Sequence, residues 1–402
     1  MDSATETEAR TDQSGEKSRT GDRQVGRVAS RRGFLALAGA GVTTALAGCS
    51  GGSAGAGTTT SGGQQTRMEP ASLDFQMQWY RNDTGTFAPL TAAEQWTWPA
   101  YNLDVTVKES EGSQAAAKAI SVKDAPVGQA ELGAAIPLIE KGAPIKIIGN
   151  YMGPFGGVVY LKETGIETWS DLEGKTIGQW PWGSSGPVAK AAMREKGVDL
   201  STIEFQNVQP GSARKIQLDG QIDAMIRYVP QELAMFEQKG IEAGALRSVA
   251  VLGHMGNGLL AHEEFIEEHP DQVSRIVAGW LDGVKKWATD YEEVTAAHRE
   301  IVKAESSRKW NAEYHDALTG PMFSAYTPPK AVGNKHGKGW IPMDRMDSTI
   351  ETFHQAGLLE SKPDAEEICT NEYIEGHHEL AVETASALYD QLEQYDVSPT
   401  YI

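Results

Sequence analysis

Residues 171–190, D-L-E-G-K-T-I-G-Q-W-P-W-G-S-S-G-P-V-A-K, combine the signals of a short strand, a loop and a helix start. The apolar centre of 175–179 predicts a strand, which the breakers at 180–183 end. The serines and the proline of 184–187 predict a serine-capped helix with proline at its first position. The unpaired N–H groups at such a helix start can hold an anionic or polar aromatic molecule. An ordinary strand–loop–helix junction with tryptophans in the core is the alternative.

Strands and helices are predicted to alternate on both sides of this stretch. The predicted strands are 73–79, 103–107, 125–129, 145–149, 158–161, 203–206, 221–226 and 248–252, and the predicted helices between them are 87–96, 114–120, 132–141, 187–196, 211–219 and 230–239. This alternation is typical of α/β domains with a parallel sheet. In such sheets ligands bind at the carboxyl ends of the strands, so we expect the loops 79–85, 109–114 and 129–132 to face a site.

Two stretches rich in glycine and other helix or strand breakers, 150–157 and 254–258, divide the chain into two α/β sets. Helices are predicted to dominate from residue 265 onward. The sequence therefore predicts two α/β lobes that are joined twice, with a helical C-terminal part. We assign residues 73–153 and 259–402 to the first lobe and residues 154–258 to the second.

The N-terminus has the layout of an export signal. Arg31 and Arg32 precede an uncharged stretch of Ala, Gly, Val, Thr and Leu, as in twin-arginine signals. L-A-G-C at 46–49 resembles a lipobox, in which Cys49 becomes the lipidated first residue. We therefore expect a signal at 1–48 and a Gly/Ser-rich tether at 49–72 that holds the protein at the extracytoplasmic face of the membrane.

The remaining chain is strongly acidic. Residues 49–402 carry 49 Asp and Glu against 29 Lys and Arg, a net charge of −20. This charge argues against nucleic acid as a partner and fits a protein from a halophilic source, where high salt screens the repulsion. Cys369 is the only other cysteine, so a disulfide is not expected, and its simplest role is that of a buried structural residue.

Several motifs, in the same order and spacing, resemble one family of transport proteins. They are Q-W-Y-R-N at 78–82, N-L-D-V-T-V at 102–107, K-G-A-P-I-K at 141–146, W-S-D-L-E-G-K at 169–175, D-G-Q-I-D-A-M at 219–225 and H-E-E-F-I-E-E-H-P at 262–270. From about residue 73 to about residue 290 the chain resembles solute-binding proteins of ATP-driven importers in the nitrate, taurine and alkylsulfonate class. It is most similar to the branch that includes binding proteins for the thiamine pyrimidine precursor.

The resemblance implies a bilobal periplasmic-binding-protein-like fold of type II, which closes on a ligand in the cleft. By position, the implied cleft residues are Trp79, Asn82, Ser113, Glu131, Tyr151, Trp182, Ser184, Ser185 and Tyr228. The histidine that the family often carries after the first strand is replaced by D-T-G at 83–85. The cysteine-rich motif of the related pyrimidine synthases is absent.

Each candidate residue has a structural alternative. Trp79 is interpreted as a stacking surface, or else as a core residue. Glu131 is a candidate acceptor for a ligand amine, or else a solvated loop charge. Arg227 is a candidate partner for a sulfonate or phosphate, or else for a surface carboxylate. The serines at 113, 184 and 185 fit helix caps as well as ligand donors. Aromatic residues at these places, with Phe155, favour an organic ligand over nitrate.

These observations predict a lipid-anchored receptor that passes a small organic solute, either a pyrimidine or a sulfonate, to a membrane permease. We expect a monomer. Catalytic residues, a cofactor and a metal are not expected, because the histidines lack metal-ligand spacing and no nucleophile elbow is present. Two alternatives stay open. One is an enzyme on the same fold that acts on a pyrimidine-type compound, and the other is an extracytoplasmic sensor.

Overall fold

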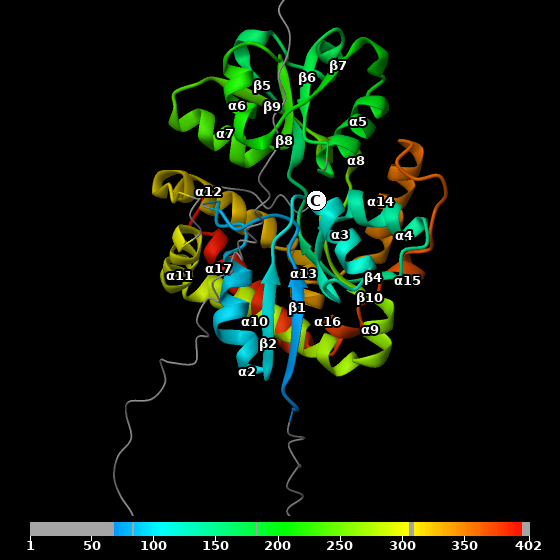
Figure 1. The fold of residues 1–402 in the computed structure, drawn as a ribbon, viewed down its shortest axis with the longest axis vertical. Helices are drawn as coiled ribbons and strands as arrows, with labels where there is room; N and C mark the ends of the chain where they lie inside the picture. The colour runs from blue at the N-terminus through cyan, green and yellow to red at the C-terminus, as the bar shows by residue number, and fades with distance from the viewer. Residues whose placement is uncertain (1–67, 83, 182, 305–308, 396–402) are drawn as a thin grey trace, which may run out of the picture. The chain divides into compact units, whose positions relative to one another are not determined.

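The computed structural model describes residues 68–82, 84–181, 183–304 and 309–395, which belong to a single contact unit (Figure 1). The predicted export signal, Cys49 and most of the predicted tether lie outside the described residues. Within the described residues, the helices are too short or too polar to cross a membrane. The structure contains two five-stranded sheets with helices around them, which confirms the predicted α/β class.

The first sheet has the strand order β2-β1-β3-β10-β4. Its strands are β1 (Ala71–Gln76), β2 (Leu103–Lys108), β3 (Val127–Glu131), β4 (Ile145–Met152) and β10 (Asn257–His262). β1 pairs in parallel with β2 and β3, whereas β10 lies between β3 and β4 and is antiparallel to both. The expectation of a parallel sheet is therefore correct for β1–β3 and wrong at β10, because β10 returns from the second sheet in the opposite direction.

The second sheet repeats this arrangement in the order β7-β6-β8-β5-β9. Its strands are β5 (Gly156–Leu161), β6 (Thr176–Gln179), β7 (Glu204–Asn207), β8 (Ala224–Tyr228) and β9 (Ala243–Arg247). β6 is parallel to β7 and β8, and β5 is antiparallel to β8 and β9. The strand predicted at 248–252 is wrong, since these residues form helix α8 and the edge strand precedes them. A five-residue apolar run has too little periodicity to tell the two apart.

The helices that follow the strands cover the sheets (Figure 1). Those in the first part are α1 (Ala88–Ala92), a π-helical turn (Ala93–Thr97), α2 (Trp98–Ala100), α3 (Ser113–Ser121) and α4 (Leu132–Glu140). Those in the second are α5 (Ser185–Glu195), α6 (Pro210–Leu218), α7 (Val229–Gln238) and α8 (Ser248–Leu252), with short 3₁₀ turns at Lys162–Thr164, Trp169–Leu172 and Leu200–Thr202.

The C-terminal part is helical, as predicted, and Figure 1 shows most of its helices beside the first sheet. They are α9 (Glu263–Glu268), α10 (Pro270–Thr289), α11 (Tyr291–Ala304), α12 (Ala312–Tyr326), α13 (Lys330–His336), α14 (Met343–Gln355), α15 (Ala365–Ile368), α16 (Glu372–Glu375) and α17 (His378–Leu392). Helix α10 is amphipathic, and its buried Trp280 and Trp287 join the main core. Cys369 is buried as expected, and burial raises the pKa of its thiol to about 12.

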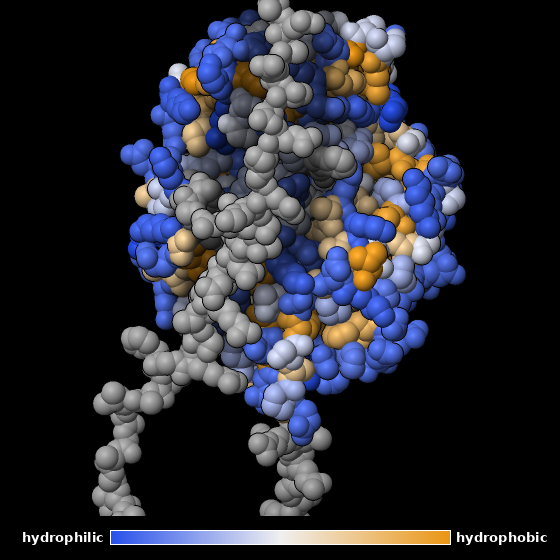
Figure 2. Space-filling model, in the orientation of Figure 1, coloured by the Kyte–Doolittle hydropathy of each residue, from blue (hydrophilic) through white to orange (hydrophobic). Residues whose placement is uncertain are grey.

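The visible surface is mostly hydrophilic (Figure 2). Among the described residues, the exposed large apolar side chains are Met68, Val122 and Leu218, which are far apart in the sequence. Isolated apolar side chains of this kind are ordinary on a protein surface. The described surface is therefore polar, without a gathering of exposed large apolar side chains.

The chain passes between the sheets at two segments that touch each other. The first follows β4 at residues 153–155, and the second precedes β10 at residues 253–256. Gly256 lies so close to the first segment that a Cβ atom there would be 2.3 Å from the carbonyl carbon of Gly153. The Gly256 carbonyl also accepts a hydrogen bond from the N–H of Leu132 at 2.8 Å. Only glycine fits at this crossing.

Candidate ligand-binding site

A cavity of about 370 Å³ lies between elements of the two sheets. Loops at the carboxyl ends of β1, β2, β6 and β8 supply most of its wall, which is where parallel strands place ligands. The described lining residues are Trp79, Tyr80, Asn82, Thr84, Thr86, Phe87, Gly112, Ser113, Trp180, Gly183, Ser184, Ser185, Gly186, Gly211, Arg214, Ile226, Arg227, Tyr228, Gln231, Glu232, Met235 and Tyr314.

Aromatic side chains form one part of the wall. The rings of Trp79 and Tyr80 lie 4.7 Å apart between centroids, and Trp79 also packs partly against the main core. Trp79 therefore lines the cavity and also contacts the core, and its role as a stacking surface stays a prediction. From the second sheet, Tyr228 enters the cavity, and the indole N–H of Trp180 donates to the carbonyl of Glu111 at 3.1 Å. These faces provide a surface on which a planar ring can stack.

A buried carboxyl lies behind the serine side of the cavity. Ser184 donates its hydroxyl hydrogen to the carboxylate of Glu131, which is 1% exposed. The N–H of Glu131 donates to Ser113 Oγ at 3.2 Å, and Ser113 donates to Gln78. Burial raises the pKa of Glu131 to about 7, although the bond from Ser184 opposes the shift. Burial and the nearby Glu131 carboxylate also raise the pKa of Tyr228.

Ser184 differs from its predicted role as a helix cap. It occupies the N-cap position of α5, but its hydroxyl bonds Glu131 instead of the backbone of its own helix. Pro187 is the third residue of α5 and not the first, because the helix begins at Ser185. The bond from Ser184 joins the start of α5 to the end of β3 behind the cavity wall, and so connects elements of the two sheets.

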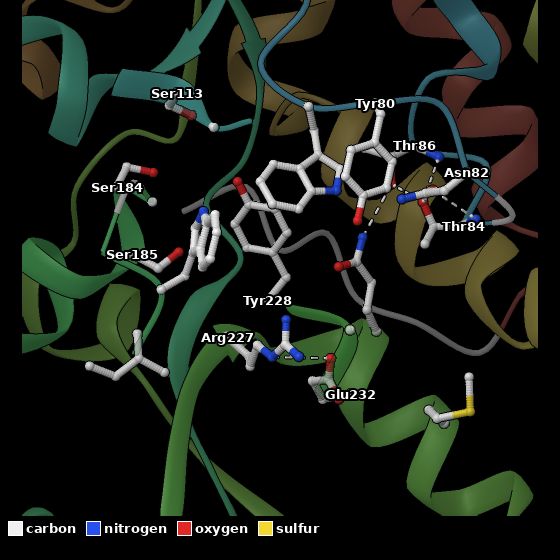
Figure 3. A pocket seen from close by; sticks show the side chains of 18 of the residues that line it. Tyr80, Asn82, Thr84, Thr86, Ser113, Ser184, Ser185, Arg227, Tyr228 and Glu232 are labelled. Atoms are coloured by element: carbon white, nitrogen blue, oxygen red, sulfur yellow. Dashed lines mark hydrogen bonds and ion pairs between the residues drawn. The ribbon is translucent and has the colours of Figure 1, made fainter. Parts of the chain in front are cut away.

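A hydroxyl network forms the opposite side, as Figure 3 shows. Thr84 donates to Asn82 Oδ1 at 2.6 Å and shares a hydrogen bond of 2.7 Å with Thr86. Gln231 on α7 donates to Thr86 at 3.4 Å, and Tyr314 on α12 donates to the Gln231 carbonyl at 3.1 Å. Asn82 is therefore held by its own loop, and α7 contacts that loop directly.

Three charged side chains meet at another edge of the cavity. Arg214 on α6 binds Glu232 on α7 with two hydrogen bonds, at 2.7 and 3.2 Å. Arg227 on β8 approaches the same carboxylate at 3.5 Å. Burial lowers the pKa of Arg227, while the Glu232 carboxylate acts in the opposite direction. Neither Arg214 nor Glu232 is among the residues predicted from the sequence. Glu232 is the fourth residue of α7, near a helix start like Ser113, whereas Arg214 lies in the middle of α6.

The structure brings seven of the predicted site residues to one cavity: Trp79, Asn82, Ser113, Ser184, Ser185, Arg227 and Tyr228. Glu131 lies behind this wall. Tyr151 lies elsewhere, because β4 continues through it and turns its ring into the core, where it stacks on Trp280 at 5.4 Å. Phe155 is buried beside Tyr228. Trp182 lies outside the described residues, which also contain no group of three or more His, Cys, Asp and Glu that could hold a metal.

Comparison with known families decides the relationship of this chain. The family model described as NMT1/THI5 like matches residues 86–293, just over half of the chain. The chain belongs to the NMT1/THI5-like family. The match includes the carboxyl ends of β2, β6 and β8 at the cavity and begins after the loop that follows β1. It confirms the resemblance inferred from the sequence motifs.

Individual members of the wider group differ in what they are named for. The chain is 22% identical to the riboflavin-binding protein RibY of Chloroflexus aurantiacus over 242 residues, 59% of this chain and 67% of RibY. It is 26% identical to the 4-amino-5-hydroxymethyl-2-methylpyrimidine phosphate synthase of Schizosaccharomyces pombe over 179 residues, 40% of this chain and 51% of the synthase. The chain thus spans about half the length of that enzyme.

A solved structure shows the same fold. The alkanesulfonate-binding protein SsuA of Xanthomonas axonopodis pv. citri, which was bound to MOPS, superposes with a TM-score of 0.57. It is 16% identical, and the match covers 75% of this chain and 99% of SsuA. The NMT1/THI5-like chain described here therefore has the bilobal fold of the solute-binding proteins of ATP-binding-cassette importers.

Proposed function

We propose that this protein is the solute receptor of an ATP-binding-cassette importer and captures a small organic molecule with a planar ring. The observation that carries the proposal is the cavity itself, in which Trp79 and Tyr80 from the first sheet face Tyr228 and Trp180 from the second. A ligand there touches elements of both sheets, so its binding would favour closure about the two crossing segments. The permease would then recognise the closed form.

The proposed lobes are residues 73–153 with 259–402, and residues 154–258. Strands β1–β4 and β10 fall mainly in the first range and β5–β9 in the second, which supports this division. Among ring compounds, we consider the thiamine pyrimidine precursor and riboflavin first, since relatives of this chain are named for such molecules. Sulfonates that carry a ring are the next candidates, since SsuA, which has the same fold, is named as an alkanesulfonate-binding protein.

We also propose that Cys49 anchors the protein outside the cell membrane. The support is the order of Arg31, Arg32, the small-residue stretch and Cys49 in the sequence. In the native host, Cys49→Ser is expected to move most of the protein from the membrane fraction to the soluble extracytoplasmic fraction. Immunoblots of both fractions measure this, with Cys369→Ser as the matched control. A C49S variant that remains in the membrane fraction would contradict the anchor.

An enzyme on the same fold is the second candidate, because one relative is a pyrimidine phosphate synthase. The cavity does not favour an enzyme of this kind, because its described lining contains no cysteine, whereas the related synthases carry a cysteine-rich motif. Cys369 is buried away from the described lining residues, and Cys49 belongs to the proposed anchor. Incubating the protein with each ring compound and analysing the compound by mass spectrometry distinguishes the two functions. A receptor returns the ligand unchanged, whereas any turnover supports the enzyme.

Removing the stacking surface tests the proposed function. We would measure the binding of riboflavin, the hydroxymethyl pyrimidine precursor and aromatic sulfonates by isothermal titration calorimetry, and we expect at least one of these compounds to bind. Trp79→Leu keeps an apolar side chain without the indole face, so we expect its affinity for that ligand to fall about tenfold.

Trp96→Leu is the matched control, because Trp96 lies outside the described cavity lining, with the Lys286 ammonium 4.9 Å from its ring centroid. Its affinity should equal that of the unmodified protein. Equal affinity for the ligand in Trp79→Leu would refute stacking on this residue. A folded protein that binds none of the ring compounds would refute the proposed function.

A further inference from the structure

The serines of the cavity wall use their hydroxyl hydrogens behind the wall. Ser184 donates its hydrogen to the Glu131 carboxylate, and Ser113 donates its hydrogen to Gln78 Oε1 at 3.3 Å. Both acceptors are 1% exposed and lie outside the described lining, whereas both serines line the cavity. Figure 3 shows the two serines on the side of the cavity away from Asn82. Toward a ligand they therefore present oxygen lone pairs and not O–H groups.

Some of these lone pairs have no donor within the protein. A hydroxyl oxygen can accept two hydrogen bonds. The Ser113 oxygen accepts one, from the N–H of Glu131 at 3.2 Å, and in the described part of the chain no N–H donates to the Ser184 oxygen. Burial raises the pKa of the Tyr228 phenol, and both serine hydroxyls act in the opposite direction, so the phenol lies near them. Its single O–H can fill one acceptor position, which leaves at least two for a ligand.

These positions define the chemistry that a ligand needs on this side. A ligand that covers the serine oxygens separates them from water, and a buried acceptor without a donor weakens the complex. An amino group carries two hydrogens and can satisfy two such positions. An anionic group is disfavoured here, because Ser184 already connects the Glu131 carboxyl to the start of α5, where the helix dipole would otherwise favour an anion.

The orientation of the Ser184 hydroxyl depends on two elements meeting. Glu131 ends β3 of the first sheet, whereas Ser184 precedes α5, which follows β6 of the second sheet. Their hydrogen bond forms only when these elements are close together. If the proposed lobes separate, Ser184 loses this acceptor, and its hydrogen becomes free to donate elsewhere. Glu131 therefore fixes the hydroxyl as an acceptor for the ligand only in the closed arrangement.

Resting on the proposed function, we propose that the solute is a planar ring compound with an amino or other N–H group, which donates hydrogen bonds to Ser113 and Ser184 when the lobes close. Glu131 is a positioning residue, because it turns the Ser184 hydrogen away from the ligand. The serine side of the cavity then selects ligands by the direction of their hydrogen bonds, while the aromatic side holds the ring.

Matched ligands test this selection. We would titrate the mature protein with the 4-amino, 4-methyl and 4-methoxy derivatives of quinazoline, which share one ring system and offer a donor, neither group, or only an acceptor at the same place. The hydroxymethyl pyrimidine precursor and its analogue with methyl in place of the amino group form a second set. At about pH 8.5, above the pKa of Glu131, we expect each amine to bind at least about tenfold more tightly than its analogues.

Variants then assign the selection to side chains, with the ratio of amine to methyl or methoxy affinity as the readout. Ser184→Ala removes an acceptor and should lower the amine-to-methyl ratio at least about fivefold. Glu131→Leu frees the Ser184 hydrogen and should lower the amine-to-methoxy ratio by a similar factor, whereas Glu131→Gln retains an accepting oxygen and should keep both ratios. Ser72→Ala removes an exposed hydroxyl on β1, outside the described lining, and should change nothing.

The possible failures are distinguishable. If the amines bind no better than their analogues, or if only ring compounds without an N–H group bind, the inference is refuted while ring binding stands. If Ser184→Ala weakens all ligands equally, its role is structural and the inference fails. Ser184→Ala decides this even if Glu131→Leu does not fold. If no ring compound binds to the folded protein, the proposed function fails as well.

Discussion

Replacing Gly256 with alanine is expected to lower the free energy of unfolding by about 3 kcal/mol or more, the largest effect of a single methyl group that we predict. The added Cβ atom would lie 2.3 Å from the carbonyl carbon of Gly153, 2.4 Å from the nitrogen of Pro154 and 2.5 Å from the carbonyl oxygen of Met152. All three are backbone atoms, so no side chain can rotate away. The two crossing segments must separate instead.

The separation should also weaken ligand binding, because the same segments set how the two sheets face each other across the cavity. Denaturant unfolding and titration with the best ligand measure the two effects. Gly211→Ala is the control for stability, since a Cβ atom there meets nothing within 4 Å and alanine favours the helix. If Gly256→Ala lowers the free energy of unfolding by less than about 1 kcal/mol, the two crossing segments can separate at little cost, which would contradict this prediction.

The second large effect is a pH dependence of stability that originates at Glu131. Burial raises its pKa to about 7 in the folded protein, from an ordinary value of 4.5. Between these values the folded state holds a proton that the unfolded state has released, so the free energy of unfolding falls as the pH rises from about 4.5 to about 7. The shift corresponds to about 3 kcal/mol, which is lost in full above pH 7.

Glu131→Gln isolates this contribution. Glutamine stays neutral and its side-chain oxygen still accepts from Ser184, so the variant should be about 3 kcal/mol more stable than the unmodified protein at pH 8 and similar to it at pH 4. The comparison is needed because burial lowers the pKa of His254 to about 4 and that of His298 to about 3. Those groups act in the opposite sense, and they are the same in both proteins. Parallel pH profiles for the two proteins would contradict the assignment to Glu131.

Local sequence patterns predicted the alternation of strands and helices, because the spacing of apolar residues in a segment shows which of its faces is buried. Strand direction is not a local property, so nothing within residues 257–262 indicates that β10 is antiparallel to β3 and β4. Tyr151 illustrates the same limit. The pattern placed it in a breaker-rich crossover, whereas β4 extends to Met152 and the ring of Tyr151 meets Trp280, which is far away in the sequence.

The candidate site was predictable where helix starts and strand ends mark it. Ser113, Ser184 and Tyr228 stand at such positions, and all line the cavity. The Arg214–Glu232 pair could not be predicted in this way. It joins two different helices, and its guanidinium and carboxylate meet only in the folded chain. Glu131 could have been a solvated charge in a loop, as the sequence also allowed, but its burial in the structure excludes that alternative.

The inserted strand β10 also constrains the order in which the protein can be completed during synthesis. The second sheet comes from one uninterrupted run, β5 to β9, and can close as soon as that run has left the ribosome. The first sheet cannot, because β10 must enter between β3 and β4 from about 100 residues downstream. Until then β3 and β4 each present an unpaired edge, the feature that makes nascent chains prone to mispairing. The second sheet can thus finish folding first, although it comes later in the sequence, and the first sheet is completed only when β10 is inserted.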